Sequence, residues 1–275
     1  MCNLKIFLSF TILIIFISFK LSSQTSREYY ESGDNKYKEK DYIGAISDLN
    51  KASELMPENP SIYNLRGIVK GEIKEYSGAL RDFNKAIEVD PNYSAAYCNR
   101  GTLKFILEDY YGAKFDYDKS IQLDSGDSKN YYCRGNLEDE QSDYEGAIAD
   151  YSKAIGLKPD YLQAYNNRGI TKGKMKDYNG SIEDFNKAIE LNPEYSEAYF
   201  NRGYAKYLLK DYKNSIEDFN KVIEAEPDKA PAFRIRGIDK ALLGNYDEGC
   251  KDLKKAKKLG DESNLLQEYL EKYCK

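Results

Sequence analysis

The sequence predicts an all-α protein built from a short helical unit that recurs along most of the chain. An aromatic residue comes four positions before each of seven regularly spaced glycines, and a tyrosine comes nine positions after each. Self-similarity at a fixed period of about 20 to 50 residues marks repeat architectures, so we expect an open stack of seven copies. The glycines, 34 residues apart, are Gly33, Gly67, Gly101, Gly135, Gly169, Gly203 and Gly237.

Each copy has the spacing of two amphipathic helices. In the second copy, Tyr63, Gly67 and Gly71 follow one another at intervals of four, and the run 76–87 places its apolar residues on one face. Pro60 suits the first position of a helix, where its missing N–H costs nothing. We therefore expect two antiparallel helices joined by a short turn.

Acidic residues are expected to start the second helix of each copy. A carboxylate in this place accepts hydrogen bonds from backbone N–H groups that have no partner within the helix. These residues are Asp41, Glu75, Asp109, Asp143, Asp177 and Asp211.

The pattern resembles the tetratricopeptide repeat family, over about residues 26–263. The resemblance rests on the 34-residue period with aromatic, glycine, alanine and proline residues at the family's slots. Asn-Arg-Gly at 99–101, 167–169 and 201–203, with Asp-Tyr at 41–42 and 177–178, is similar to the subset common in bacteria. The resemblance implies a right-handed α-α superhelix, a solenoid whose concave groove binds peptide or protein segments.

The expected segments follow from this register. The final stretch places Leu265, Leu266, Tyr269 and Leu270 on one helical face, as a helix that caps a repeat array requires. The copies are predicted at 26–59, 60–93, 94–127, 128–161, 162–195, 196–229 and 230–261, followed by a capping helix at 262–275.

The N-terminus departs from the repeat pattern. Residues 6–19 carry no charge and are almost all apolar, between Lys5 and Lys20. This is the order of regions in a secretory signal peptide, predicted at 1–24, and the apolar run is short for a membrane span. We expect cleavage and a periplasmic or extracellular protein. An uncleaved membrane anchor is the alternative.

Composition argues against several functions. The chain has 41 Lys and Arg against 46 Asp and Glu, a net charge of −5, whereas nucleic-acid binding calls for a basic surface. It has no histidine, the commonest general base and metal ligand. We expect no enzymatic activity, no cofactor and no metal.

Cysteines add one candidate crosslink. Cys250 lies in the last repeat and Cys274 near the end of the capping helix, so in an oxidising compartment a disulfide would fasten the cap. Two free thiols are the alternative. Cys98 and Cys133 are expected to stay unpaired because neighbouring helix axes lie about 8–10 Å apart.

Charged residues recur with the glycines. Six of the seven glycines directly follow an arginine, and an aspartate follows every glycine by fifteen positions. We interpret each arginine as the partner of an aspartate on an adjacent helix, in a ladder that fixes the register between copies. Such recurring charges serve the fold, not catalysis.

Positions that vary between copies are the candidates for recognition. They lie three before, and one, four and five after each glycine, on one face of the first helix. In the family this face lines the groove. Copies six and seven place aromatic and aliphatic residues there beside Arg234, which is typical of a binding hot spot. Packing against the neighbouring helix or the cap is the alternative. The predicted groove residues are Tyr30, Asn64, Ile68, Tyr132, Asn166, Ile170, Phe200, Tyr204, Tyr207, Arg234 and Ile238.

The leading hypothesis is an exported, non-enzymatic scaffold that binds a protein or peptide segment in its groove. The alternative is a structural subunit of a cell-envelope assembly, held by an uncleaved N-terminal anchor. The lysine that family members use to clamp a partner's C-terminal carboxylate is replaced by Tyr132 and Glu197, so such a clamp is not expected.

Overall fold

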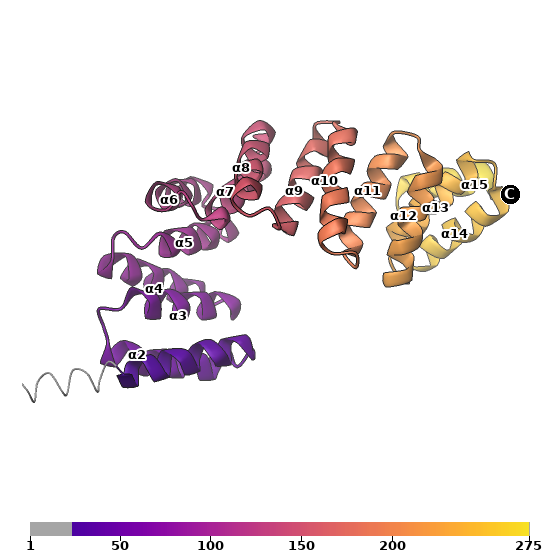
Figure 1. Ribbon diagram of the computed structural model, residues 1–275. Helices are drawn as coiled ribbons and strands as arrows, with labels where there is room; N and C mark the ends of the chain where they lie inside the picture. The colour runs from indigo at the N-terminus through magenta and orange to yellow at the C-terminus, as the bar shows by residue number, and fades with distance from the viewer. Residues whose placement is uncertain (1–23, 275) are drawn as a thin grey trace, which may run out of the picture. The chain divides into compact units, whose positions relative to one another are not determined.

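The computed structural model describes residues 24–274, and every regular element within them is an α-helix. The predicted signal peptide or anchor lies outside the described residues, apart from its last position. Within residues 24–274 no helix has the length and hydrophobicity needed to span a membrane. Residues 24–38 are helical, and the helices that follow (Figure 1) are α2 (Tyr42–Leu55), α3 (Pro60–Glu72), α4 (Tyr76–Val89), α5 (Ser94–Ile106), α6 (Tyr110–Leu123), α7 (Ser128–Glu140), α8 (Tyr144–Leu157), α9 (Leu162–Lys174), α10 (Tyr178–Leu191), α11 (Ser196–Leu208), α12 (Tyr212–Ala225), α13 (Ala230–Leu242), α14 (Tyr246–Lys258) and α15 (Asn264–Tyr273).

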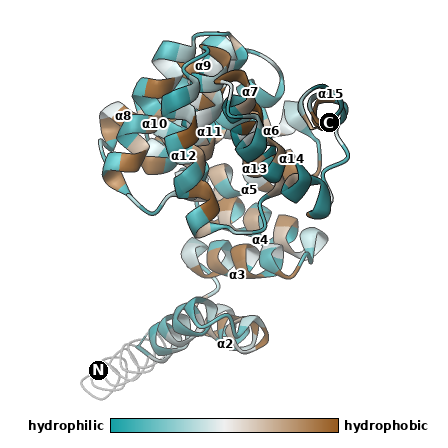
Figure 2. Ribbon diagram, turned by 90° about the vertical axis from the view of Figure 1, so that its right-hand side faces the viewer, coloured by the Kyte–Doolittle hydropathy of each residue, from teal (hydrophilic) through white to brown (hydrophobic). Residues whose placement is uncertain are grey.

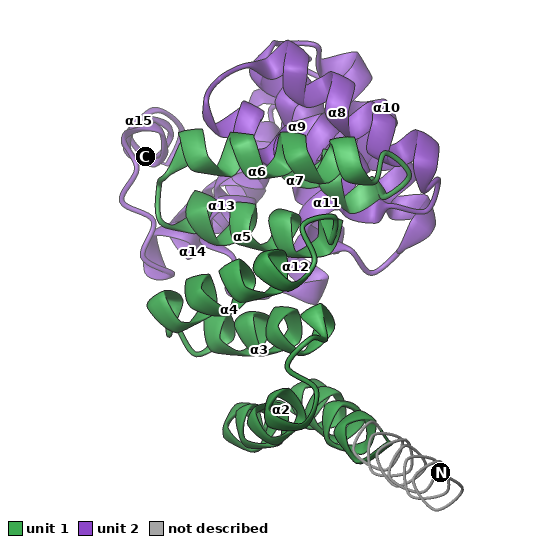
Figure 3. Cartoon of the chain, turned by 90° about the vertical axis from the view of Figure 1, so that its left-hand side faces the viewer, with its two compact units in different colours: residues 1–133 green, residues 134–275 purple. Residues whose placement is uncertain are grey.

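Consecutive helices pack as pairs, which confirms the all-α repeat fold. α3 packs against α4, α5 against α6, α9 against α10, α11 against α12 and α13 against α14. Individual helices carry both hydrophobic and hydrophilic residues (Figure 2), as expected for elements with one buried side. The chain divides into two compact units, residues 1–133 and 134–275 (Figure 3).

Helix starts follow the predicted chemistry. The side chains of Asp41, Asp109, Asp143, Asp177 and Asp211 each accept a hydrogen bond from the backbone N–H three residues later. Glu75 makes no such bond. Pro60 lies in the first turn of α3, behind an Asn59 cap, as the sequence predicts.

The turn inside each copy has a feature that the sequence did not reveal. The residue seven positions after each repeated glycine has a positive φ, between 61° and 87°, but only the last of these residues is glycine. Left-handed backbone costs energy in any residue with a Cβ. The residues are Lys40, Lys74, Glu108, Ser142, Lys176, Lys210 and Gly244.

The predicted arginine–aspartate ladder is present, with one correction. Arg168 binds Asp184 through two hydrogen bonds of 2.9 and 2.6 Å, but this pair lies inside one copy, between α9 and α10. A third nitrogen of Arg168 reaches back to the Ser152 hydroxyl of the preceding copy at 2.8 Å. This third bond therefore links each such copy to the one before it. Arg66, Arg100, Arg202 and Arg236 repeat the arrangement with an asparagine as the backward partner.

The capping helix α15 takes the place of the first helix of a further copy. It begins at Asn264, 34 residues after α13 begins at Ala230, and it packs against α13 and α14. Leu266 is fully buried in the same hydrophobic cluster as Leu253 of α14. A disulfide joins Cys250 to Cys274, with a Cα–Cα distance of 5.4 Å.

Candidate functional site

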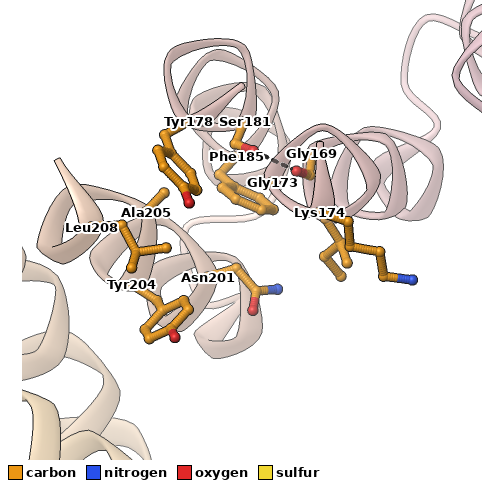
Figure 4. Close-up of a pocket in the computed structure, with 11 residues that line it drawn as sticks. Gly169, Gly173, Lys174, Tyr178, Ser181, Phe185, Asn201, Tyr204, Ala205 and Leu208 are labelled. Atoms are coloured by element: carbon orange, nitrogen blue, oxygen red, sulfur yellow. Dashed lines mark hydrogen bonds between the residues drawn. The ribbon is translucent and has the colours of Figure 1, made fainter. Parts of the chain in front are cut away.

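An apolar cavity of about 280 Å³ opens between the fifth and sixth helix pairs, within the second unit (Figure 4). Three helices contribute to its wall: the C-terminal half of α9, the start of α10 and the C-terminal half of α11. The lining residues are Gly169, Ile170, Gly173, Lys174, Tyr178, Ser181, Phe185, Asn201, Tyr204, Ala205 and Leu208.

The cavity exists because glycine takes a place where other copies carry a large side chain. Gly173 stands four residues after Gly169, and the first, third and sixth copies have an aromatic residue in that slot. Without a side chain on Gly173, the rings of Tyr178 and Phe185 border open space (Figure 4).

Polar groups at the cavity already have partners within the protein. The Ser181 hydroxyl donates to the Gly169 carbonyl at 2.6 Å, and the Asn201 amide donates to Asn166 Oδ1 at 3.2 Å. Lys174 Nζ lies 2.5 Å from Asp139 Oδ2. The remaining lining is largely apolar, so the cavity suits an apolar side chain.

Some of the predicted groove residues meet at this cavity. Ile170 and Tyr204 line it, and Tyr204 is 43 % exposed. Ile68 lines a separate cavity in the first unit. Tyr30, Tyr132, Phe200 and Tyr207 are half-buried.

The cap covers this face of the last copy, so the prediction for Ile238 is wrong and Arg234 is engaged within the protein. Ile238 is fully buried in the cluster that also contains Leu266 of α15. Arg234 donates to Asp261 at 2.6 Å and to Ser263 at 2.8 Å, just ahead of α15. Ile238 is therefore closed to a partner, whereas the side chain of Arg234 fastens the cap and stays 21 % exposed.

Two predicted asparagines also serve the fold. Asn64 and Asn166 are 8 % and 2 % exposed. Asn64 Oδ1 accepts a hydrogen bond of 2.9 Å from Asn99, 35 residues later, and Asn166 accepts the equivalent bond from Asn201. These amide pairs link the first helices of successive copies.

Cys98 and Cys133 are free thiols that lie closer together than the sequence suggested. They occupy the two slots that hold the Asn64–Asn99 pair elsewhere, and their thiols hydrogen-bond with each other. This bond, with burial, raises the pKa of Cys98 well above its usual value, and the same bond lowers the pKa of Cys133. Within residues 24–274, no group of three or more acidic or cysteine side chains converges as a metal site.

Sequence profiles of the tetratricopeptide repeat match residues 94–127, 162–195 and 196–229, and a TPR repeat profile matches residues 135–176. No curated protein matches the chain.

Solved structures of this class resemble the fold. YrrB, described as a TPR protein with an unusual peptide-binding site, is 25 % identical with a TM-score of 0.62, over 69 % of this chain and 97 % of YrrB. PilF from Pseudomonas aeruginosa is 19 % identical with a TM-score of 0.70, over 78 % of this chain and 97 % of its own.

A tetratricopeptide repeat protein from Parabacteroides merdae is 22 % identical with a TM-score of 0.60 and covers 92 % of this chain and all of its own. The similarity to PilF and to the Parabacteroides protein shows a shared fold only. With its helix pairs in a 34-residue register and these profile matches, the chain belongs to the tetratricopeptide repeat family.

Proposed function

We propose that this protein is an exported, non-enzymatic scaffold that binds a segment of another protein along the first helices of its repeats. The observation that carries the proposal is the cavity at Gly173, which lies on the stripe that varies between copies. At this cavity the variable slots leave Tyr204 and Leu208 partly exposed. An open apolar cavity among them is a place for a partner's side chain.

Two further points support the proposal. YrrB has the same fold at 25 % identity and is described as having a peptide-binding site. Two lining groups that could serve as a nucleophile and a base are engaged elsewhere: the Ser181 hydroxyl donates to the Gly169 carbonyl, and Lys174 pairs with Asp139. Export rests on the N-terminal sequence pattern.

Affinity capture tests this function. A Tyr204→Ala/Leu208→Ala variant removes two exposed side chains from the cavity wall, and Ile43→Ala removes an exposed side chain on α2 that lines no described cavity. A partner captured by the wild type and by Ile43→Ala, but lost with the double variant, supports the proposal. Equal capture by all three proteins contradicts it.

A second candidate function follows from α6. Tyr111 is 88 % exposed and Phe115 is 60 % exposed, one turn apart on the same face. The corresponding pair in the fifth copy is Asn179 and Glu183. This exposed aromatic pair favours a subunit of a larger assembly that docks through its second helices. Loss of the captured partner with Tyr111→Ala/Phe115→Ala would favour this alternative.

A further inference from the structure

One slot on the first helix takes contrasting residues in different copies. This slot, four residues after each repeated glycine, holds an aromatic residue in three copies, namely Tyr37, Phe105 and Tyr207. It holds glycine in two copies, at Gly71 and Gly173. The remaining two copies have Asp139 and Ala241.

The three aromatic copies share one packing geometry. Each ring lies against the tyrosine five residues later, at the start of the second helix. The centroid distances are 6.2 Å for Tyr37–Tyr42, 5.8 Å for Phe105–Tyr110 and 6.2 Å for Tyr207–Tyr212, with interplanar angles of 45° to 47°. This tilted arrangement is favourable for aromatic rings. The three copies therefore show that an aromatic ring fits this position against the tyrosine of the second helix.

The two glycine copies leave the same place open. The cavity at Gly173 has a counterpart of about 270 Å³ at Gly71, in the first unit. Tyr76 and Phe83 border the first-unit cavity as Tyr178 and Phe185 border the other, 102 residues later. Each tyrosine lacks the ring that covers its equivalents in the aromatic copies.

Neither glycine is required by the packing of the fold. A Cβ added to Gly71 would meet no atom within 4 Å, and one added to Gly173 would meet only the Ser181 hydroxyl, at 3.2 Å. The sixth copy carries Tyr207 together with Ser215, which stands where Ser181 does. Serine there is thus compatible with an aromatic neighbour. Gly71 and Gly173 lie in the last turns of α3 and α9 without a positive φ, so the backbone does not call for glycine there either. Packing alone gives no reason for glycine at these two positions.

We propose that the cavities at Gly71 and Gly173 are two separate sockets, each of which accepts an aromatic side chain from a bound protein segment. The inference rests on the proposed function and specifies the chemistry of the partner. The guest ring would lie on Tyr76 or Tyr178 as Phe105 lies on Tyr110. Both volumes lie just below the range of about 300–1,000 Å³ typical of sites for whole small molecules, which suits a single side chain.

The amides of the socket glycines provide a direct test. Selective ¹⁵N-glycine labelling of the full-length chain limits the spectrum to its 19 glycines. The probes are N-acetyl-phenylalaninamide, N-acetyl-leucinamide and N-acetyl-alaninamide. We expect the phenylalanine probe to shift the signals of Gly71 and Gly173 at millimolar concentration. Its affinity should exceed that of the leucine probe by about 2- to 10-fold, the range of aromatic pair energies.

Matched variants separate the socket from general effects. Gly173→Tyr copies the residue of the sixth copy and should abolish the probe-induced shift of Gly169, which lines the same cavity, while the Gly71 signal still shifts. Gly156→Tyr is the control, because Gly156 lies next to the end of its helix as Gly173 does, is exposed, has no atom near an added Cβ and lines no described cavity. Tyr37→Gly should create a third socket against Tyr42.

Each outcome decides the proposal. Equal or tighter binding of the leucine probe would overturn the aromatic assignment while leaving the scaffold function standing. No shift at either glycine with any probe would overturn the sockets. Partner capture that depends on Tyr204 and Leu208 but not on Gly173→Tyr would likewise overturn the Gly173 socket without affecting the proposed function.

Discussion

At the scale of single residues, two classes of glycine share the same helix. Gly169 lies against the ring of Phe185, and a Cβ there would meet the ring at 2.7 Å, whereas a Cβ on Gly173 would meet only the Ser181 hydroxyl, at 3.2 Å. Gly169→Ala should therefore lower the free energy of unfolding by about 1–3 kcal/mol through overpacking. Gly173→Ala should raise it by up to about 1 kcal/mol through helix propensity. Urea denaturation of the two variants measures both values, and changes of the same sign would contradict this assignment.

The effect of Asp239 on the stability of the fold depends on pH. Its side chain is fully buried, and neither carboxylate oxygen has a hydrogen-bond partner within the described residues. Burial raises its pKa to about 7, and the nearby Ser215 hydroxyl offsets only part of this shift. Tyr207, which adjoins it, has a pKa raised to about 12 by burial and stays neutral.

The folded-state pKa of Asp239 lies above the unfolded value of about 3.9, so the folded protein binds more protons between those values. Stability should fall as pH rises from about 4 to 7, by at most about 4 kcal/mol, and then level off. Asp239→Asn should remove this part of the slope. Denaturation at pH 5 and pH 8 checks it, and the chain has no histidine to titrate there. An unchanged slope in the variant would refute the assignment.

At the scale of helices, removing an arginine of the arginine–aspartate ladder should lower the stability of the fold without weakening partner binding. Asp184 is almost fully buried, and Arg168 and Lys172 both bind it. Arg168→Ala should cost about 2–3 kcal/mol, because it leaves the carboxylate with only Lys172. The control Lys187→Ala removes an exposed pair with Glu190 and should cost less than about 0.5 kcal/mol. Weaker partner binding by Arg168→Ala at an unchanged melting temperature would show that the ladder has a binding role.

The cap predicts a local effect of reduction. The disulfide closes a loop of 24 residues, which corresponds to about 3 kcal/mol of stabilisation in the chain-entropy model. Reduction or Cys274→Ser should speed amide exchange in α15 before it affects α9 and α10. Mass spectrometry after alkylation, with and without reductant, checks the crosslink itself. Equal masses in both samples would show that the two thiols are free.

The helices could be predicted from the sequence because their determinants recur. Aspartate caps and paired apolar faces appear in copy after copy, so each copy supports the interpretation of the others. Whether each variable position is exposed or covered could not be predicted in the same way. The position of Ile238 relative to Gly237 identifies the helical face on which it lies. It does not reveal that α15 covers this face. The distance between helix axes likewise says little about Cys98 and Cys133, whose side chains point toward each other.

The sockets show the same limit. The sequence places Gly71 and Gly173 in a variable slot, but a glycine there does not reveal a cavity by itself. The cavity becomes evident only when the ring contacts of Tyr37, Phe105 and Tyr207 define what is missing.

At the scale of the whole molecule, the N-terminal sequence predicts where the protein works. If the signal is cleaved, the mature chain begins at or near Gln24, and its net charge changes from −5 to −7 with the loss of Lys5 and Lys20. N-terminal sequencing of protein from its source cells tests this. A chain that retains residues 1–23 would instead support the anchored assembly.

The central claim is that the variable stripe of the first helices, with its open cavities, is where a partner binds. Crosslinking in the source cells, with wild type, Gly71→Phe/Gly173→Tyr and Gly156→Tyr compared side by side, tests it most directly. We expect wild type and Gly156→Tyr to capture the same protein, and the double variant to lose it while melting no lower than wild type. Undiminished capture by the double variant would contradict a role for the cavities, and undiminished capture by Tyr204→Ala/Leu208→Ala as well would contradict binding on this stripe.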